Sequence, residues 1–195
     1  MTCVLSPPAV RGREGADPPP RAVGARRLLA DPDAVDAVCA ALSAVSGPAG
    51  APVILVATDY TGFAADAFVA RRDDGSARLR PCDSVALEPA GLLQRFIAVT
   101  GWRGPAYILG SRPEDGQAAV DLALAMVGSG RAPSVQVCEV LRHPDTGAFW
   151  AVATRVAPGR PPAPGPVPLP PGTGAALWER SAVARAYLRQ ITGAS

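Results

Sequence analysis

The sequence has no lysine, and its 19 basic residues are all arginines. They are spread along the chain without a dense run, and the net charge at pH 7 is only +2. Binding to the phosphate backbone of nucleic acids requires clustered positive charge. The sequence therefore argues against a dedicated nucleic-acid surface.

Histidine and cysteine are also scarce, with one histidine, His143, and four cysteines. Cys3, Cys39, Cys82 and Cys138 lie far apart and form no C-x-x-C pair, so no metal site is expected. Cys39 and Cys138 lie within apolar patterns and are predicted to be buried, reduced thiols. Since no glycine-rich nucleotide-binding pattern occurs either, we expect no cofactor.

Long apolar runs are missing as well. No stretch approaches the roughly 20 residues of a membrane-spanning helix. The amino-terminal MTCVLSPP is interrupted by proline too early for a signal peptide. We therefore expect a soluble, cytoplasmic protein that contacts no membrane, and the 195 residues fit one compact core.

Strand-like and helix-like segments alternate along the chain. Apolar, β-branched runs predict five strands, over residues 2–5, 53–58, 106–109, 134–141 and 149–156. Helical spacing predicts helices over 31–46, 63–70, 88–100 and 117–127. The predicted fold class is α/β, with a mostly parallel, mixed five-stranded sheet, helices on both faces and a hairpin formed by the last two strands.

The composition divides the chain into three parts. Residues 1–156 are predicted to form the main domain, although 7–27 lack periodicity and are expected to be a surface excursion. Residues 157–174 are rich in proline and are expected to be an extended linker. Residues 175–195 are predicted to form an amphipathic helix, which docks either on its own sheet or on a partner.

Three motifs follow one another in a familiar order. They are Ser84–Gly91 (SVALEPAG), Gly101–Pro105 (GWRGP) and the helix AAVDLALAMVGSGRA that precedes a strand. Their order resembles the amino-terminal half of β-ketoacyl synthases and their chain-length-factor relatives in the thiolase superfamily. The resemblance covers about residues 50–156 and implies a thiolase-like half-fold for residues 1–156.

In that family, a cysteine at the start of the buried helix attacks the acyl thioester, because helix amides lower the thiol pKa. Aligning Gly116 with the family glycine places Pro113, Glu114 and Asp115 on the family's Cys-Ser-Ser. Proline cannot be a nucleophile. The family's two catalytic histidines come from a carboxyl-terminal half that this chain lacks, and His143 matches neither. The resemblance therefore implies a pseudo-ketosynthase without a catalytic residue.

Several other residues offer alternative chemistry. Ser111 and Cys82 are alternative nucleophiles, and either would make the chain an acyltransferase or thioesterase. A turn or cap role is nevertheless favoured for Ser111, and a passive thiol is favoured for Cys82. Asp59 and Tyr60 follow the predicted central strand, where α/β folds often bind ligands, but a turn role is favoured for both. His143 is interpreted as a turn residue.

The resemblance also implies a partner. In the family, the strand that leads to the nucleophile lies at the dimer interface and pairs antiparallel with its counterpart. The corresponding interface residues here are Ala106, Tyr107, Ile108, Leu109 and Gly110. A half-sized unit is also expected to leave a large face uncovered, so partner binding would bury apolar surface.

The expected function is therefore that of a non-catalytic, chain-length-factor-like subunit. It would pair with a full-length ketosynthase in type II polyketide or fatty-acid biosynthesis, polyenes included, stabilise it and shape the acyl pocket. An acyl carrier protein would deliver the acyl groups. A homodimeric interaction module without acyl chemistry is the remaining alternative.

Overall fold

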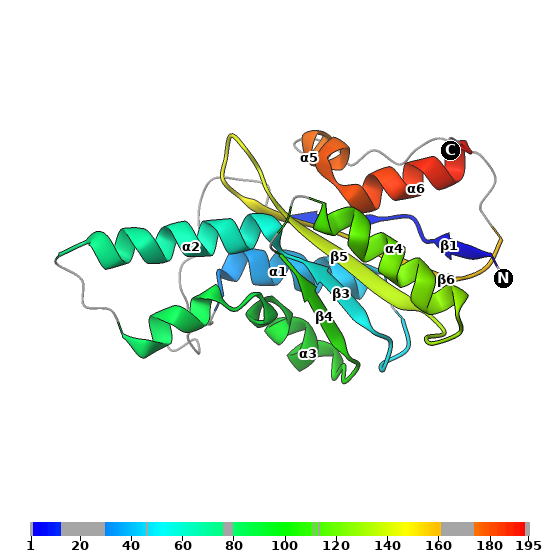
Figure 1. The fold of residues 1–195 in the computed structure, drawn as a ribbon, viewed down its shortest axis with the longest axis horizontal. Helices are drawn as coiled ribbons and strands as arrows, with labels where there is room; N and C mark the ends of the chain where they lie inside the picture. The colour runs from blue at the N-terminus through cyan, green and yellow to red at the C-terminus, as the bar shows by residue number, and fades with distance from the viewer. Residues whose placement is uncertain are drawn as a thin grey trace.

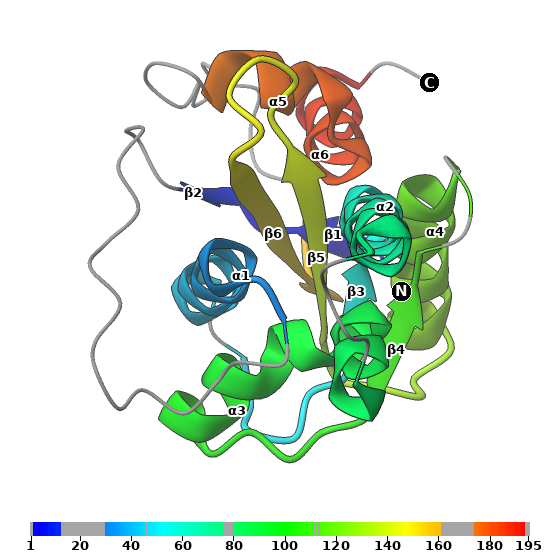
Figure 2. The same cartoon turned by 90° about the vertical axis from the view of Figure 1, so that its left-hand side faces the viewer.

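The computed structural model describes residues 2–12, 30–45, 47–75, 80–110, 112, 114–160 and 174–193. In this part of the chain a six-stranded sheet has the order β1-β6-β5-β3-β4, and β2 also pairs with β6. The strands are β1 (Cys3–Leu5), β2 (Ala9–Gly12), β3 (Val53–Val56), β4 (Ala106–Leu109), β5 (Val135–Arg142) and β6 (Phe149–Pro158). The helices are α1 (Pro32–Ala44), α2 (Thr58–Asp73), α3 (Gln94–Thr100), α4 (Asp115–Gly128), α5 (Gly174–Arg180) and α6 (Ala182–Thr192), with 3-10 helices η1 (Pro81–Leu87) and η2 (Pro89–Leu93). Figures 1 and 2 show helices on both faces of the sheet.

The parallel part of the sheet is built around β3. This strand pairs in parallel with β4 on one side and with β5 on the other. All four of its residues are buried, as expected for the uniformly apolar run VILV in a strand covered on both faces. On the far side of β5, the predicted hairpin is present and pairs Val135 with Val156 and Arg142 with Phe149.

Helix α1 begins where the sequence predicts. The Asp31 carboxylate accepts hydrogen bonds from the backbone N–H groups of Asp33 (3.0 Å) and Ala34 (3.1 Å), and Pro32 occupies the first helical position. These contacts satisfy amide donors that have no partner within the helix. The local sequence therefore fixes the start of this helix.

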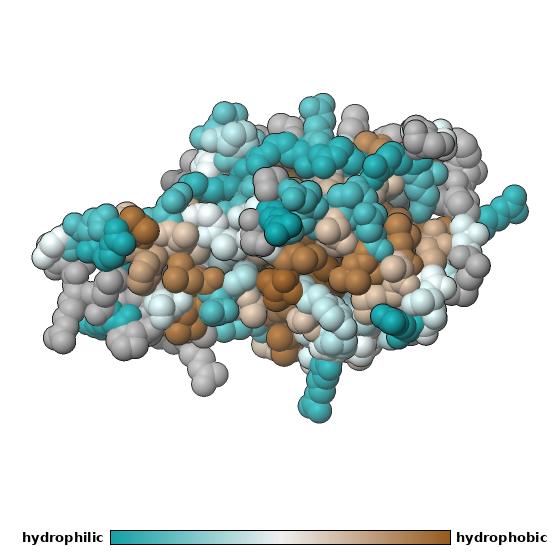
Figure 3. Space-filling view, in the orientation of Figure 1, coloured by the Kyte–Doolittle hydropathy of each residue, from teal (hydrophilic) through white to brown (hydrophobic). Residues whose placement is uncertain are grey.

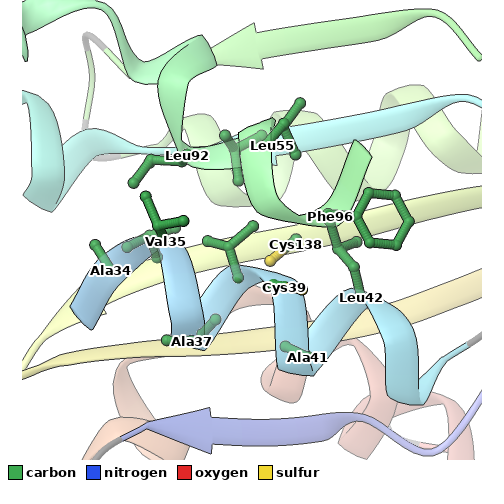
Figure 4. Packing of buried hydrophobic residues seen from close by; sticks show 14 of the residues in the cluster. Ala34, Val35, Ala37, Cys39, Ala41, Leu42, Leu55, Leu92, Phe96 and Cys138 are labelled. Carbon is green, nitrogen blue, oxygen red and sulfur yellow. The ribbon is translucent and has the colours of Figure 1, made fainter. Parts of the chain in front are cut away.

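The buried face of α1 packs on one face of the sheet together with η2 and α3 (Figure 4). Val35 and Leu42 of α1, Leu92 of η2 and Leu55 of β3 are all fully buried there, and Phe96 of α3 closes the cluster. The apolar residues whose helical spacing predicts α1 are therefore the residues that pack into this core.

The opposite face of the sheet is covered by α4, α5 and α6. Ala119 and Ala123 of α4 pack against the sheet with Leu177 of α5 and Val183 of α6, all at 0% exposure. The carboxyl-terminal helices therefore dock in cis, which the sequence left open. The region predicted as one helix is divided at Ser181, whose hydroxyl accepts a hydrogen bond from the Ala184 N–H and caps α6.

The structure corrects the predicted sheet in two respects. It has six strands rather than five, because Ala9–Gly12 pairs antiparallel with β6 in a region expected to be an excursion. The antiparallel part is also larger than expected, since β1, β2 and β5 all pair antiparallel with β6 and the parallel part is limited to β4, β3 and β5. The fold class is nevertheless the expected mixed α/β sheet with helices on both faces.

Helix α2 is longer than predicted. It begins directly after β3 and extends well beyond the sheet (Figure 1). Most of its second half is exposed. No helix in the described part of the chain is both long and apolar enough to cross a membrane.

Candidate functional site at the β4 edge and the start of α4

Strand β4, which carries the predicted interface residues, is at the edge of the sheet. The Val53 N–H donates to the Pro105 carbonyl (3.0 Å), and the Ala57 N–H donates to the Leu109 carbonyl (2.7 Å). Because peptide groups alternate in direction along a strand, the N–H and C=O groups of Ala106 and Ile108 point away from β3. No strand of the described chain pairs with that side, so β4 presents free hydrogen-bonding groups.

Tyr107 of β4 is exposed, and other apolar side chains are exposed on elements that precede or follow β4 in the chain. Among the described residues, the exposed large hydrophobic side chains all lie between α2 and α4, on the elements that precede, form or follow β4: Val69, Val85, Ile97, Val99, Tyr107 and Leu122. Val99 at the end of α3 is 68% exposed. Figure 3 shows apolar surface gathered between β4 and α4 on the face in view. We call this set of six residues the exposed apolar set.

The turn from β4 into α4 is closed by an aspartate. The Arg112 N–H donates to the Asp115 carboxylate (3.0 Å), and the Asp115 N–H donates to the Arg112 carbonyl (3.1 Å). The Thr58 hydroxyl also donates to this carbonyl (3.3 Å). Asp115 is buried and begins α4, where the helix dipole favours negative charge. Ser111 and Pro113 lie outside the described residues.

The first turn of α4 lies against the start of α6 and a buried glutamate, Glu139 of β5. A Cβ added to Gly116 would be 2.7 Å from both the Glu139 Oε1 and the Ala182 Cβ, so only glycine fits without displacement. The Glu139 carboxylate accepts hydrogen bonds from the Ser181 hydroxyl (2.7 Å) and the Val183 N–H (3.3 Å). The space beside the start of α4 is thus filled by side chains and backbone of this chain.

Burial raises the pKa of Glu139 above its ordinary value, and the hydrogen bonds from Ser181 and the α6 amides oppose this shift only in part. Ser181 is 0% exposed, so its hydroxyl is inaccessible to a substrate even though it contacts a carboxylate. Sequence reasoning missed Glu139. The available signal was a single acidic residue inside the buried apolar run VQVCEVL.

Asp59 and Tyr60 have structural contacts. The Asp59 carboxylate accepts hydrogen bonds from the Arg142 N–H (2.8 Å) and from the Arg180 guanidinium (3.0 Å), so it ties α2 to β5 and α5. The Tyr60 hydroxyl donates to the Ala86 carbonyl (3.1 Å), and burial raises its pKa. The predicted turn role is wrong, because both residues lie in the first turn of α2, which begins directly after β3 and connects distant elements through them.

The remaining candidates are not brought together with this site. The His143 Nδ1 accepts hydrogen bonds from the N–H groups of Asp145 (3.2 Å) and Thr146 (3.3 Å), which confirms its prediction as a turn residue. Cys82 lies in η1, and its side chain is outside the described part of the structure. No cluster of three or more His, Cys, Asp or Glu side chains among the described residues could hold a metal ion.

Comparisons with known proteins identify similar structures but no family. No family model and no curated protein matches the chain. The ishigamide ketosynthase/chain length factor has a TM-score of 0.43 at 12% identity, over 60% of this chain and 39% of that chain. For the ketosynthase ApeO in complex with its chain length factor ApeC from Xenorhabdus doucetiae, the TM-score is 0.45 at 14% identity, over 65% of this chain and 56% of that chain.

A third similar structure is the oxazolomycin ketosynthase domain OzmH KS7 of Streptomyces albus JA3453. Its TM-score is 0.41 at 12% identity, over 67% of this chain and 28% of that chain. The chain thus spans between 28% and 56% of the length of these structures.

Proposed function

We propose that this chain is a non-catalytic, chain-length-factor-like subunit that pairs with a full-length ketosynthase. In polyketide or fatty-acid biosynthesis it would stabilise that subunit and help to shape the pocket for acyl groups delivered by an acyl carrier protein. The observation that carries the proposal is the free edge of β4 together with the exposed apolar side chains Tyr107 of β4 and Leu122 of the adjoining α4.

The edge supplies main-chain hydrogen bonds for a partner strand. The outward N–H and C=O groups of Ala106 and Ile108 are separated by one residue, which is the spacing that an added antiparallel strand uses. Exposed edge strands are usually blocked by charge, by proline or by a covering element. In β4 the sequence AYIL has no charged residue or proline, so it favours pairing.

Apolar surface on the exposed apolar set would stabilise such a complex when a partner covers it. Apolar surface contributes about 25 cal/mol for each Å² removed from water, and stable interfaces bury about 1,200–2,000 Å² in total. Tyr107 is on β4 and Leu122 is on α4, which contacts β4, so a partner surface that covers β4 can also reach Leu122. This arrangement favours a protein partner over a small-molecule substrate.

The contacts of α4 support a non-catalytic role. A nucleophile at the start of α4 would need open space in front of the helix amides to accept an acyl group. Here Glu139 and Ala182 lie within 2.7 Å of a Cβ placed on Gly116, and the nearby hydroxyl of Ser181 is fully buried. The first turn of α4 is therefore used for packing.

Co-purification with a candidate full-length ketosynthase tests the proposal. We expect a 1:1 complex by size-exclusion chromatography with light scattering. Ala106→Pro removes only the outward N–H at the first residue of an edge strand, where proline is tolerated, and should weaken the complex by tenfold or more. Ala106→Thr keeps the N–H and is the matched control. Two separately eluting proteins would contradict the proposal, and a stable homodimer that excludes the ketosynthase would support the interaction-module alternative.

A further inference from the structure

A half-open cleft of about 380 Å³ lies on the face of the molecule away from α1, between α4, α6 and β1. Figure 1 shows α4 and α6 side by side on this face. The cleft is lined by residues of all three elements: Cys3, Leu5, Gln117, Val120, Asp121, Leu124, Ala186, Arg189 and Gln190. Its volume lies near the lower end of the roughly 300–1,000 Å³ typical of small-molecule sites.

The inner wall of this cleft is apolar and held in place. Leu5 and Val120 belong to the buried core, and Leu124 packs partly against it. The Gln190 side chain is hydrogen-bonded to both backbone groups of Leu5, accepting from its N–H (2.7 Å) and donating to its C=O (3.2 Å). Because these bonds connect α6 to β1, the cleft is formed before any ligand arrives.

The rim of the cleft carries a cation with spare donors. The Arg189 guanidinium donates to the Gln117 side-chain carbonyl (2.6 Å), and the Gln117 amide in turn donates to the Asp121 carboxylate (2.8 Å). Within the described residues, Arg189 makes no ion pair. A guanidinium has five N–H donors in a fork that matches a carboxylate, so most of them remain for a ligand.

We propose that this cleft binds an amphipathic carboxylate, with the unbranched apolar chain against Leu5, Val120 and Leu124 and the carboxylate on Arg189. The lining combines apolar side chains with the Arg189 guanidinium, and an amphipathic carboxylate requires both kinds of contact. The limited volume restricts the site to one chain of medium length. This site is separate from the β4 edge, so it does not depend on the proposed partner.

The probe is decanoate below its micelle concentration, titrated into the full-length chain by calorimetry. Decanol, which has the same chain without the charge, and acetate, which has the charge without the chain, are the matched ligands. A second readout is Cys3, whose thiol lines the cleft and is partly exposed. We follow its alkylation by iodoacetamide with peptide mapping, in the presence and absence of decanoate.

We expect saturable 1:1 binding of decanoate, slower alkylation of Cys3, and no saturable binding of acetate. Loss of a charge-assisted hydrogen bond predicts at least tenfold weaker binding for Arg189→Gln. Arg185→Gln is the control, because Arg185 is on the same helix but donates to the backbone carbonyls of Glu179 and Arg180. Absence of saturable binding, unchanged affinity in Arg189→Gln, or unprotected Cys3 would each overturn the proposal.

Discussion

Replacement of Glu139 gives the most direct test of how the carboxyl-terminal helices are held. Glu139→Ala removes the acceptor for the Ser181 hydroxyl and the Val183 N–H, both of which are buried. A buried donor left without a partner costs about 1–3 kcal/mol, so two of them predict a loss of about 2–6 kcal/mol in the free energy of unfolding. Since a whole domain is stable by only about 5–15 kcal/mol, this loss is large.

Glu139 also predicts an unusual pH dependence. Burial raises the pKa of Glu139 in the folded chain. At a pH between the unfolded and the folded pKa, Glu139 is therefore protonated in the folded state and ionised in the unfolded state. The contribution of this carboxyl to stability is therefore full below the unfolded pKa and is lost as the pH rises through the folded pKa. Each unit between the two pKa values corresponds to about 1.4 kcal/mol.

Urea unfolding followed by tryptophan fluorescence between pH 5 and pH 8 measures this effect. The native chain should lose stability relative to Glu139→Gln as the pH rises, because the amide stays neutral at every pH. Glu88→Gln makes the same chemical change at an exposed position and serves as control. Two outcomes would refute the reasoning. The difference in stability between the native chain and Glu139→Gln could stay constant over this pH range, or it could grow in favour of the native chain.

Three further predictions use the same unfolding assay. Asp31→Ala removes the acceptor for two amides of α1 and should cost about 1 kcal/mol, whereas no loss would show that the cap is not formed in solution. Leu92→Ala empties a fully buried site and should cost about 2–5 kcal/mol, and a loss below 1 kcal/mol would contradict its place in the core. Gly116→Ala should destabilise, since the added methyl would lie 2.7 Å from two buried atoms, while Gly128→Ala has its nearest contact at 3.7 Å and should be neutral or stabilising by up to about 1 kcal/mol. Equal effects at the two glycines would contradict the packing around α4.

Sequence patterns predicted those helices and strands whose formation depends on residues close by in the sequence. The cap at Asp31 and the apolar run Val53–Val56 both act within a few positions, and both elements form as expected. Strand β2 was missed because it follows Pro7 and Pro8 and exists through pairing with β6. Its Gly12 lies so close to the Trp150 ring that an added Cβ would be 2.2 Å away, a constraint that nothing near Gly12 in the sequence indicates.

Strand β4 lies at the edge of the sheet, while its predicted role as an interface stays a prediction. The surroundings of α4 could not be predicted. Glu139 is explained by Ser181, which is 42 positions away in the sequence and lies beyond the proline-rich stretch. No periodicity connects the two residues, so the sequence does not predict that Glu139 has a hydrogen-bond partner in the buried strand's surroundings. The contact exists because α6 returns to the face already covered by α4.

That return also limits what a partner can bury. The sequence led us to expect a large uncovered face, yet α5 and α6 place Leu177 and Val183 at 0% exposure on it. Among the described residues, the large apolar side chains that remain exposed are those of the exposed apolar set. A strand of four residues is too small by itself to bury the roughly 1,200 Å² of a stable interface, so a partner must also cover neighbouring surface such as Leu122 of α4. Loss of the β4 edge alone should therefore weaken the complex, whereas combining it with Leu122→Arg should abolish it.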